Sequence, residues 1–312
     1  EMKYKAIFAY SFSDRNAGDF SLNIAAIDIL VKNSYSVTVI SRFLEGEVEF
    51  LSTKNYLESL FGESVKVVSS PLKLDRSANL ASKLKSNLDG LLKCLGLIKN
   101  TQSERLVQDA DLVVLCGGNV LRCGGFVDFM RLLALDYPLS LARKFKKDYV
   151  IFPQSTAEIN FLGRWVLGKM INNSKATFIR ENISFSKLKT LYPDANLVET
   201  LDLAFFLLDA RKFKPSNHVK KIAFTIRGDT LGGLSEISTY EKEEITKEIT
   251  KQVRNLKELG HDVSFIVQGA KADTLITNDI STNLLSENIN IPVIEERDTF
   301  KLIDIYSDLD LL

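Results

Sequence analysis

Five short polar motifs hold most of the side chains in this sequence that could do chemistry, and each follows an apolar run of strand length. The motifs are Asn16-Ala17-Gly18-Asp19, Cys116-Gly117-Gly118-Asn119, Pro153-Gln154-Ser155, Arg180-Glu181-Asn182 and Thr225-Ile226-Arg227-Gly228. Each stands where a predicted strand gives way to a helix. In open α/β sheets, ligands bind in the crevice outside the carboxyl ends of the strands. Five polar strand ends therefore predict one large binding cleft rather than five unrelated turns.

Arg227 is the first candidate for a catalytic residue. It ends an apolar strand, where a long cation is costly unless it meets an anionic partner. A planar guanidinium can hold a carboxylate or a phosphate through two parallel hydrogen bonds. The alternative is an ion pair with Asp229 or Glu236. Gln268 and Asp273 follow the next strand, and we expect them to line the same wall.

Two further strand ends offer groups suited to an anionic or polyhydroxylated ligand. Arg180 could bind an anion, although a local pair with Glu181 is the more frequent arrangement for such neighbours. Gln154 and Ser155 offer an amide and a hydroxyl just past a buried strand, and the alternative role is a helix cap. The sequence around Ser155 has no Gly-x-Ser-x-Gly elbow, which argues against a serine hydrolase.

The glycine motifs predict places where the backbone approaches a ligand closely. Gly18 permits a backbone conformation that other residues avoid, and Asp19 then either caps the following helix or points at a sugar hydroxyl. The cap is the more common role. Gly117 and Gly118, followed by Asn119, could present N–H groups at a helix start, although a tight turn explains them equally well. They match neither a Gly-x-Gly-x-x-Gly fingerprint nor a P-loop, so a dinucleotide is not supported.

Composition excludes several classes of protein. The 312 residues include 40 Lys and Arg against 40 Asp and Glu, and this zero net charge argues against a broad nucleic-acid surface while leaving a local basic patch open. Cys94, Cys116 and Cys123 form neither a disulfide framework nor a zinc motif, which indicates a reducing compartment, and we interpret Cys116 and Cys123 as packed thiols. No His, Asp and Glu cluster has metal-binding spacing, and no apolar run is long enough to span a bilayer.

Strands and helices alternate along the first two thirds of the chain, which predicts βαβ units and a parallel sheet. The predicted strands are Lys5–Tyr10, Ser36–Ile40, Val65–Ser69, Asp111–Leu115, Tyr149–Phe152 and Ala176–Ile179. The predicted helices are Leu22–Asn33, Asn55–Leu60, Asn79–Lys99, Ser103–Gln108, Gly124–Lys147, Leu162–Asn172 and Ile183–Leu191. We expect these elements to form one Rossmann-like domain over residues 1–208.

The alternation restarts after a polar stretch with no periodicity, residues 209–220, which we interpret as a linker. Residues 221–312 then form the predicted second Rossmann-like domain. Its expected elements are a strand at Lys221–Ile226, a helix at Tyr240–Leu259, strands at Asp262–Val267 and Ile291–Ile294, and a helix at Thr299–Tyr306. Asp308–Leu312 has the pattern of the start of another buried strand, so we expect this domain to be incomplete at Leu312.

Taken in order, the motifs resemble those of the polysaccharide pyruvyl transferase family. The matching elements are Asn16-x-Gly18-Asp19, Gly117-Gly118, Gln154-Ser155, Arg180-Glu181 with Ser184, Asp202-Leu203-Ala204-Phe205, the strand ending in Arg227, and the run Thr299–Leu312. Each motif is short, and their joint order over nearly the whole chain carries the resemblance. The glycine turn reads Gly-Gly-Asn, where the family often has a third glycine.

The resemblance implies an α/β fold of two Rossmann-like domains, as in glycosyltransferases of the B type, with the C-terminal domain incomplete in this chain. The family usually continues past a segment like Ser307–Leu312 into an Arg-x-His motif that helps to hold and protonate the donor. From the resemblance we therefore expect that the 312 residues alone are not a competent enzyme.

The resemblance also implies a function. Such enzymes move an enolpyruvyl-derived group from phosphoenolpyruvate, the donor substrate, to hydroxyls of a cell-surface polysaccharide or its precursor, which gives a pyruvate ketal without a cofactor. The implied acceptor is a glycan or a lipid-linked sugar, and the implied location is the cytoplasm, with peripheral association at the inner face of the membrane left open. Arg227 would hold the donor, and Asp19 with the other N-terminal motifs would hold the acceptor.

Two other functions remain open on the sequence. A glycosyltransferase of the same architecture would use a nucleotide sugar and would need a base pocket and a diphosphate site in the second domain. A catalytically inactive protein of this fold would only bind glycans. Turnover of phosphoenolpyruvate with a glycan acceptor would separate the enzymes from the binding protein.

Overall fold

The structure is a computed structural model that describes residues 2–72, 88–208, 219–228, 238–269 and 271–312. The chain divides into two compact units. The first contains Glu1–Ser13 and Asp19–Leu207, and the second contains Asp14–Gly18 and Leu208–Leu312. Most of the predicted linker, residues 209–218, lies outside the described part of the chain.

The first unit is built on a parallel sheet, which confirms the predicted α/β class. Along the sheet the strands run β3-β2-β1-β4-β6-β7-β8, and β5 pairs with β6. Their bounds are Tyr4–Ser11 (β1), Tyr35–Ser41 (β2), Val65–Val68 (β3), Leu112–Leu115 (β4), Gly118–Cys123 (β5), Asp148–Ile159 (β6), Ala176–Ile179 (β7) and Leu197–Glu199 (β8). The beginning of this order, 3-2-1-4, is that of a Rossmann-type sheet.

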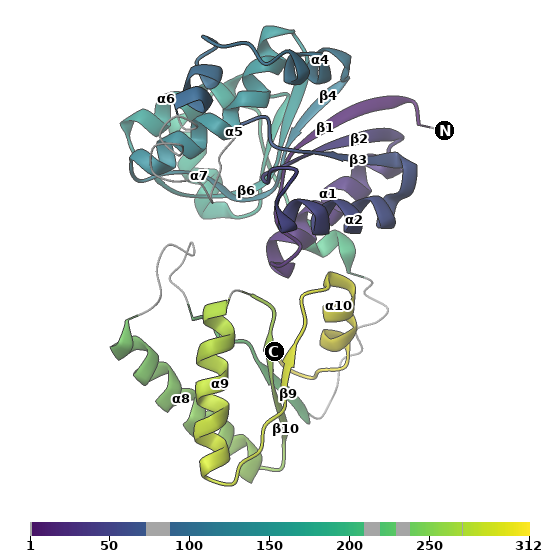
Figure 1. The fold of residues 1–312 in the computed structure, drawn as a ribbon. Coiled ribbons are helices and arrows are strands. Elements are labelled where there is room, and N and C mark those ends of the chain that lie inside the picture. The colour runs from purple at the N-terminus through teal and green to yellow at the C-terminus, as the bar shows by residue number, and fades with distance from the viewer. Residues whose placement is uncertain (1, 73–87, 209–218, 229–237, 270) are drawn as a thin grey trace. The chain divides into compact units, whose positions relative to one another are not determined.

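Helices cover both faces of this sheet (Figure 1). Their bounds are Ala17–Lys32 (α1), Val48–Phe61 (α2), Thr101–Asp109 (α4), Phe126–Lys144 (α5), Phe161–Asn172 (α6) and Asn182–Leu191 (α7), and residues 88–94 are also helical. Asparagine side chains begin two of them. The Oδ1 of Asn100 accepts a hydrogen bond from the Ser103 N–H at 3.1 Å, and the Oδ1 of Asn160 accepts one from the Gly163 N–H at 2.8 Å. Such caps satisfy N–H groups that have no partner inside the helix.

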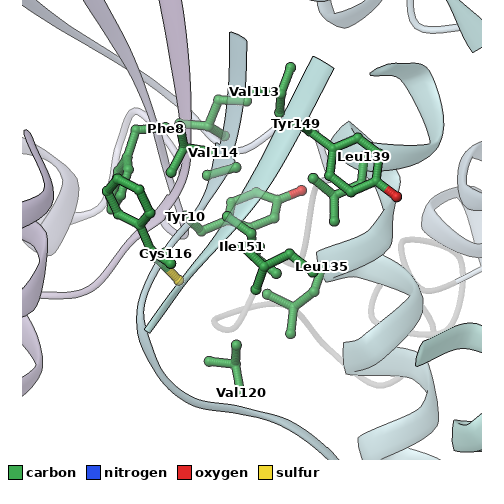
Figure 2. Close-up of a cluster of buried hydrophobic side chains, with 14 of the residues drawn as sticks. Phe8, Tyr10, Val113, Val114, Cys116, Val120, Leu135, Leu139, Tyr149 and Ile151 are labelled. Atoms are coloured by element: carbon green, nitrogen blue, oxygen red, sulfur yellow. The ribbon is translucent and has the colours of Figure 1, made fainter. Parts of the chain in front are cut away.

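The largest hydrophobic core fills the space between the sheet and its helices. Figure 2 shows side chains from the central strands, among them Phe8, Val113 and Ile151, gathered near Leu135 and Leu139 of α5. All five are at most 4% exposed. Burial of apolar surface contributes about 25 cal/mol per Å², so this contact fixes the central strands whose carboxyl ends carry the polar motifs.

The second unit has a smaller parallel sheet, in which the first three strands lie in the same order as in the first unit. Its parallel sheet runs β11-β10-β9, with β9 at Lys221–Phe224, β10 at Asp262–Val267 and β11 at Val293–Glu295. Leu311 pairs in parallel with Ile222 of β9, outside the named strands. The helices are α8 (Thr239–Glu258), α9 (Lys271–Ser286) and α10 (Thr299–Ser307). The chain therefore builds two Rossmann-like units in sequence.

Helix α9 and strand β8 were not predicted from the sequence. The signal for α9 was present, because Ile276, Ile280 and Leu284 stand four residues apart and are all buried. Polar residues between them, such as Thr277 and Asp279, weaken the apolar pattern. In the part of the chain that the structure describes, no helix is long and apolar enough to cross a bilayer.

Candidate active site at the strand ends

The glycine motif connects β4 to β5, whereas the sequence analysis expected a helix to begin there. Gly118 begins strand β5, which pairs in parallel with β6, so Gly117 and Gly118 join two strands. The φ of Gly118 is 128°, in a region that favours glycine. A Cβ on Gly117 would lie 2.8 Å from Cδ1 of Leu203. Packing therefore explains Gly117 and backbone conformation explains Gly118, while Asn119 is exposed on β5.

Gln154 lies inside β6 rather than past its end, because that strand continues to Ile159. Its side chain is fully buried. The Nε2 donates to the carbonyl of Cys116, and the Oε1 accepts from the Val120 N–H at 3.2 Å. This amide was expected to contact a ligand or to cap a helix. It instead connects β6 by hydrogen bonds to the segment that joins β4 and β5.

Arg180 is held at the carboxyl end of β7 by two side chains. Its Nε donates to the Ser155 Oγ at 2.7 Å, and a terminal nitrogen donates to Asp202 Oδ2 at 2.5 Å. The expected local partner, Glu181, does not pair with it in the described contacts. Glu181 instead accepts a hydrogen bond from Ser184, whose Oγ accepts the Thr156 N–H at 2.8 Å.

These hydrogen bonds hold three of the predicted site residues near the end of β7: Arg180 and Glu181 directly follow that strand, and Ser155 lies within β6 beside Gln154, the register partner of Ile179. The partner Asp202 lies 22 residues after Arg180 in the chain, and the long separation hides the pair from any local pattern. The Arg180 side chain remains 23% exposed and that of Asp202 27% exposed, so both reach solvent at this edge. The arrangement can present a fixed guanidinium to a ligand hydroxyl or anion.

The first polar motif lies at the start of α1. The helix begins at Ala17, so Asp19 stands in its first turn and does not occupy the N-cap position that was expected. A carboxylate in the first turn is favourable, because backbone N–H groups point toward it. Asn16 and Gly18 are exposed and belong to the second compact unit, whereas Asp19 belongs to the first.

Cys116 and Cys123 are buried thiols, as the sequence indicated, and Cys94 is partly buried. Burial raises the pKa of Cys116 to about 11 and that of Cys94 to about 12, and it also raises the pKa of Cys123. A high pKa leaves little thiolate at neutral pH, and the thiolate is the nucleophile. These residues are therefore unsuited to covalent catalysis.

We expect iodoacetamide to modify Cys116 very slowly in the native protein at pH 8. With a pKa of about 11, only about one thiol in a thousand is ionised at that pH. Unfolding in guanidinium should restore the rate of an ordinary cysteine. Mass spectrometry of timed samples would measure both rates, and rapid native modification of Cys116 would contradict the packed-thiol assignment.

Arg227 and Gln268 occupy equivalent positions beyond β9 and β10. Phe224 and Phe265 are register partners, and each candidate lies three residues further along the chain. Because β9 ends at Phe224 and not at the predicted Ile226, Arg227 lies three residues past that strand, while Gln268 directly follows β10. Arg227 is exposed, while Gln268 accepts a hydrogen bond from the hydroxyl of Tyr306. The alternative partners of Arg227, Asp229 and Glu236, lie outside the described residues.

The backbone that follows Arg227 is fixed against the start of α9. The Gly228 N–H donates to Asp273 Oδ1 at 2.7 Å. A Cβ on Gly228 would lie 2.2 Å from the carbonyl oxygen of Ala272, so a larger residue does not fit. Asp273, noted in the sequence as a possible wall residue, thus positions the end of β9.

Arg297 is a residue at these strand ends that the sequence analysis missed. It lies two residues after β11, donates from Nε to the Gly269 carbonyl at 3.3 Å, and pairs with Glu295 at 2.6 Å. Its side chain is 34% exposed. The available signal is an arginine just past a short predicted strand, although the neighbouring Glu295 and Glu296 favour a local ion pair at such a position.

Within the described ranges, no group of three or more His, Cys, Asp or Glu residues could hold a metal ion. The functional groups at the strand ends of both units are guanidinium, carboxylate, hydroxyl and backbone N–H groups. Such groups can bind anions and polyhydroxylated molecules through hydrogen bonds and charge.

The two parallel-sheet units place the chain among α/β proteins of the glycosyltransferase-B type. One similar structure is UGT73P12 of Glycyrrhiza uralensis with glycyrrhetinic acid 3-O-monoglucuronide, at 10% identity and TM-score 0.52, over 99% of this chain and 76% of that one. Another, from Listeria monocytogenes, is described as a UDP-N-acetylglucosamine 2-epimerase, at 14% identity and TM-score 0.52, over 97% and 71%. At these identities the likeness shows the fold alone.

The family follows from the sequence match. The polysaccharide pyruvyl transferase family matches residues 16–311, and the chain therefore belongs to that family and is a transferase. None of the curated proteins compared with the chain matches it. Apart from Leu312, the residues quoted for the resemblance all lie within the matched range.

Proposed function

We propose that this protein transfers an enolpyruvyl-derived group from phosphoenolpyruvate to hydroxyls of a cell-surface polysaccharide or its precursor and forms a pyruvate ketal. Family membership over residues 16–311 is the observation that carries the proposal. The strand ends supply matching chemistry. Phosphoenolpyruvate carries a phosphate and a carboxylate, and Arg227 is an exposed cation three residues past the end of β9. The reaction requires no cofactor.

The proposed reaction begins with protonation of the donor's methylene carbon, which becomes a methyl group and leaves an oxocarbenium-like centre at the neighbouring carbon. One sugar hydroxyl attacks that centre and loses its proton, and inorganic phosphate leaves. A second hydroxyl attacks the same carbon and closes the ketal. The two hydroxyl protons balance the proton added to carbon and the one taken by phosphate. Fixed cations stabilise the charge on the departing phosphate.

Arg227 is assigned to the donor because its position is suited to an anion. The hydrogen bond from the Gly228 N–H to Asp273 fixes the backbone next to Arg227. The guanidinium of Arg227 therefore extends from a backbone of fixed position. A preorganised cation loses less conformational freedom when it binds. Gln268 accepts from Tyr306 and could still donate from its amide to a donor oxygen.

The second half of β6, the residues just past β7 and the start of α1 are assigned to the acceptor. Ser155 and Arg180 present a hydroxyl and a guanidinium, while Asp19 and Glu181 present carboxylates. Carboxylates commonly accept hydrogen bonds from hydroxyl groups. Asn16 and Gly18 precede Asp19 in the first motif and Asn119 lies on β5, and all three are exposed. Gln154, Gly117 and Gly118 support this wall from within the core.

Asp19→Asn is expected to raise the KM for the acceptor by about tenfold, equivalent to about 1.4 kcal/mol. The neutral amide loses the charge-assisted hydrogen bond to a sugar hydroxyl. Loss of the charge in the first turn of α1 should change stability by less than about 1 kcal/mol. The matched control is Asp28→Asn on the same helix, where Asp28 pairs with exposed Lys32. An unchanged acceptor KM for Asp19→Asn would remove Asp19 from the site.

Release of phosphate tests the proposal. The full-length protein, given phosphoenolpyruvate and an oligosaccharide acceptor, should release phosphate only when both are present. Release of a nucleoside diphosphate from a nucleotide sugar would instead identify a glycosyltransferase. Saturable glycan binding without turnover of either donor would identify a binding protein.

A further inference from the structure

Arg297 is a second arginine at the carboxyl edge of the smaller sheet, in addition to Arg227. It lies two residues past β11, and Arg227 lies three residues past β9, with β10 between these two strands. Neighbouring strands of a sheet lie about 4.8 Å apart, so β9 and β11 are separated by about 10 Å. Two long side chains that extend from these strand ends can therefore contact opposite ends of one small ligand.

The side chain of Arg297 reaches from the end of β11 to the end of β10. Its Nε donates to the carbonyl of Gly269 at 3.3 Å, and Gly269 is the second residue past β10. Gln268 lies between Gly269 and the strand, and its side chain accepts a hydrogen bond from the hydroxyl of Tyr306. The guanidinium of Arg297 therefore lies beside the end of the central strand.

The carboxylate of Asp273, in the first turn of α9, contacts both of the segments that hold the arginines. Its Oδ1 accepts a hydrogen bond at 2.7 Å from the N–H of Gly228, the residue after Arg227. A Cβ on Gly269 would overlap its Oδ2, so Gly269, which accepts from Arg297, packs against the same carboxylate. Asp273 therefore holds the backbone beside Arg227 close to the carbonyl that Arg297 contacts.

The ion pair between Arg297 and Glu295 is of the kind that a ligand can displace. A terminal nitrogen of Arg297 lies 2.6 Å from Glu295 Oε1, and the two side chains are 34% and 45% exposed. Such exposed pairs contribute little to stability, because water screens the charges. A phosphate carries more negative charge than the carboxylate of Glu295 and offers more acceptor oxygens. An anionic ligand can therefore exchange with Glu295 at small cost.

The other carboxylates described next to Arg297 already accept backbone N–H groups. Glu296 accepts from the N–H groups of Arg297 and Asp298, each at 2.9 Å. Asp298 is the N-cap of α10 and accepts from two N–H groups in the first turn of that helix. These backbone dipoles partly balance the two negative charges. Glu295 is therefore the carboxylate that competes directly for the guanidinium.

We infer that Arg297 binds one of the two anionic groups of the donor and that Arg227 binds the other. The inference rests on the proposed function, in which the donor phosphoenolpyruvate carries a phosphate and a carboxylate. One guanidinium can donate two parallel hydrogen bonds to one such group, so two separate groups are best held by two cations. Arg297 exchanges its pair with Glu295 for the ligand, and Glu295 therefore weakens donor binding by competing for Arg297.

Removal of the competing carboxylate provides the first test. Glu295→Gln in the full-length protein should strengthen phosphoenolpyruvate binding by about threefold, because Arg297 then has no ion pair to give up. Isothermal titration calorimetry without an acceptor measures this affinity. The matched control is Glu287→Gln, which removes the same charge from a similarly exposed pair with Arg254 and should leave the affinity unchanged. Equal affinities for the two variants would overturn the inference.

Removal of the cation provides the second test. Arg297→Gln and Arg227→Gln should each weaken phosphoenolpyruvate binding by about tenfold or more, the loss expected for a charge-assisted contact. Inorganic phosphate contains only one of the two groups, so one of these variants should weaken its binding and the other should leave it nearly unchanged. Unchanged phosphoenolpyruvate affinity in Arg297→Gln, or equal losses of phosphate affinity in both variants, would contradict a division of the donor between two arginines.

The same titrations separate this inference from the proposed function. No binding of phosphoenolpyruvate to the unaltered full-length protein would remove the proposed function and this inference with it. Binding that falls in Arg227→Gln but not in Arg297→Gln would leave the proposed function intact and overturn the inference alone. Since Glu295 acts through Arg297, Glu295→Gln should give no gain of affinity in a protein that also carries Arg297→Gln. A gain that persists there would show that Glu295 affects the donor without Arg297, against the inference.

Discussion

Arg227→Ala is expected to lower kcat/KM for phosphoenolpyruvate by about 100-fold or more. Removal of one preorganised group that stabilises charge in a transition state typically costs about 10²–10³ in rate. Arg227 lies three residues past the end of β9, beside a glycine that is fixed by Asp273. The change removes a cation from the expected donor site and leaves the buried strand intact. Steady-state kinetics with varied donor would measure the effect.

Two variants control this prediction. Arg227→Lys keeps the charge but loses the planar pair of donors, so it should recover only part of the activity. Arg254→Ala removes an arginine of the same unit whose pair with Glu287 is exposed, and it should leave the kinetics unchanged. Donor kinetics for Arg227→Ala that equal those of Arg254→Ala would exclude Arg227 from the donor site.

Arg143→Met is expected to lower the free energy of unfolding by about 3 kcal/mol or more, the largest stability effect that we predict. Arg143 donates to both oxygens of Asp136 at 2.9 and 2.7 Å, and also to the hydroxyl of Tyr149 at 3.3 Å. Asp136 is buried. Breaking a buried pair by removing one partner leaves an uncompensated charge and typically costs about 3–5 kcal/mol. Chemical denaturation at pH 8 would measure the loss.

The pH dependence of that loss gives an independent check. Burial raises the pKa of Asp136, and Arg143 opposes the rise. Without Arg143 the folded-state pKa should rise further above the unfolded value. The folded variant then holds a proton that the unfolded chain has released, so its stability should fall as pH rises between those two pKa values. The penalty of Arg143→Met should therefore be smaller at pH 5 than at pH 8.

Matched variants separate the buried charge from other effects of the substitution. Lys144→Met removes the neighbouring cation, whose side chain is 51% exposed in its pair with Glu104, and should cost less than about 1 kcal/mol. Adding Asp136→Asn to Arg143→Met should recover part of the loss, because no ionised carboxylate then remains buried. A loss for Arg143→Met no larger than that for Lys144→Met would contradict the buried-pair account.

Most of the fold could be predicted from the sequence because buried parallel strands are short, apolar and separated by helices. Strand β10 was predicted at its observed bounds, Asp262–Val267, and the repeated alternation indicated two parallel sheets. Strand β5 could not be predicted in this way. Gly118–Cys123 pairs with an extension of β6, and the pairing depends on a contact between residues about 35 positions apart.

The candidate site was predictable at the level of strand ends but not of contacts. The motifs indicated which residues lie near the carboxyl edges, and Ser155 and Arg180 do meet there. The sequence did not show that Gln154 turns into the core, or that Arg180 pairs with Asp202 rather than Glu181. Both outcomes depend on how long β6 is and on where the chain returns after β8, which no local pattern specifies.

Transfer in deuterated water tests the central claim most directly. The full-length protein, phosphoenolpyruvate and a glycan acceptor are combined in deuterium oxide, and the product is analysed by mass spectrometry and NMR. Protonation of the donor's methylene carbon predicts a ketal whose methyl group carries one solvent deuterium, with one phosphate released per ketal. A glycan that gains no pyruvate ketal while the protein consumes a nucleotide sugar, or that gains one without solvent deuterium in the methyl group, would contradict the account.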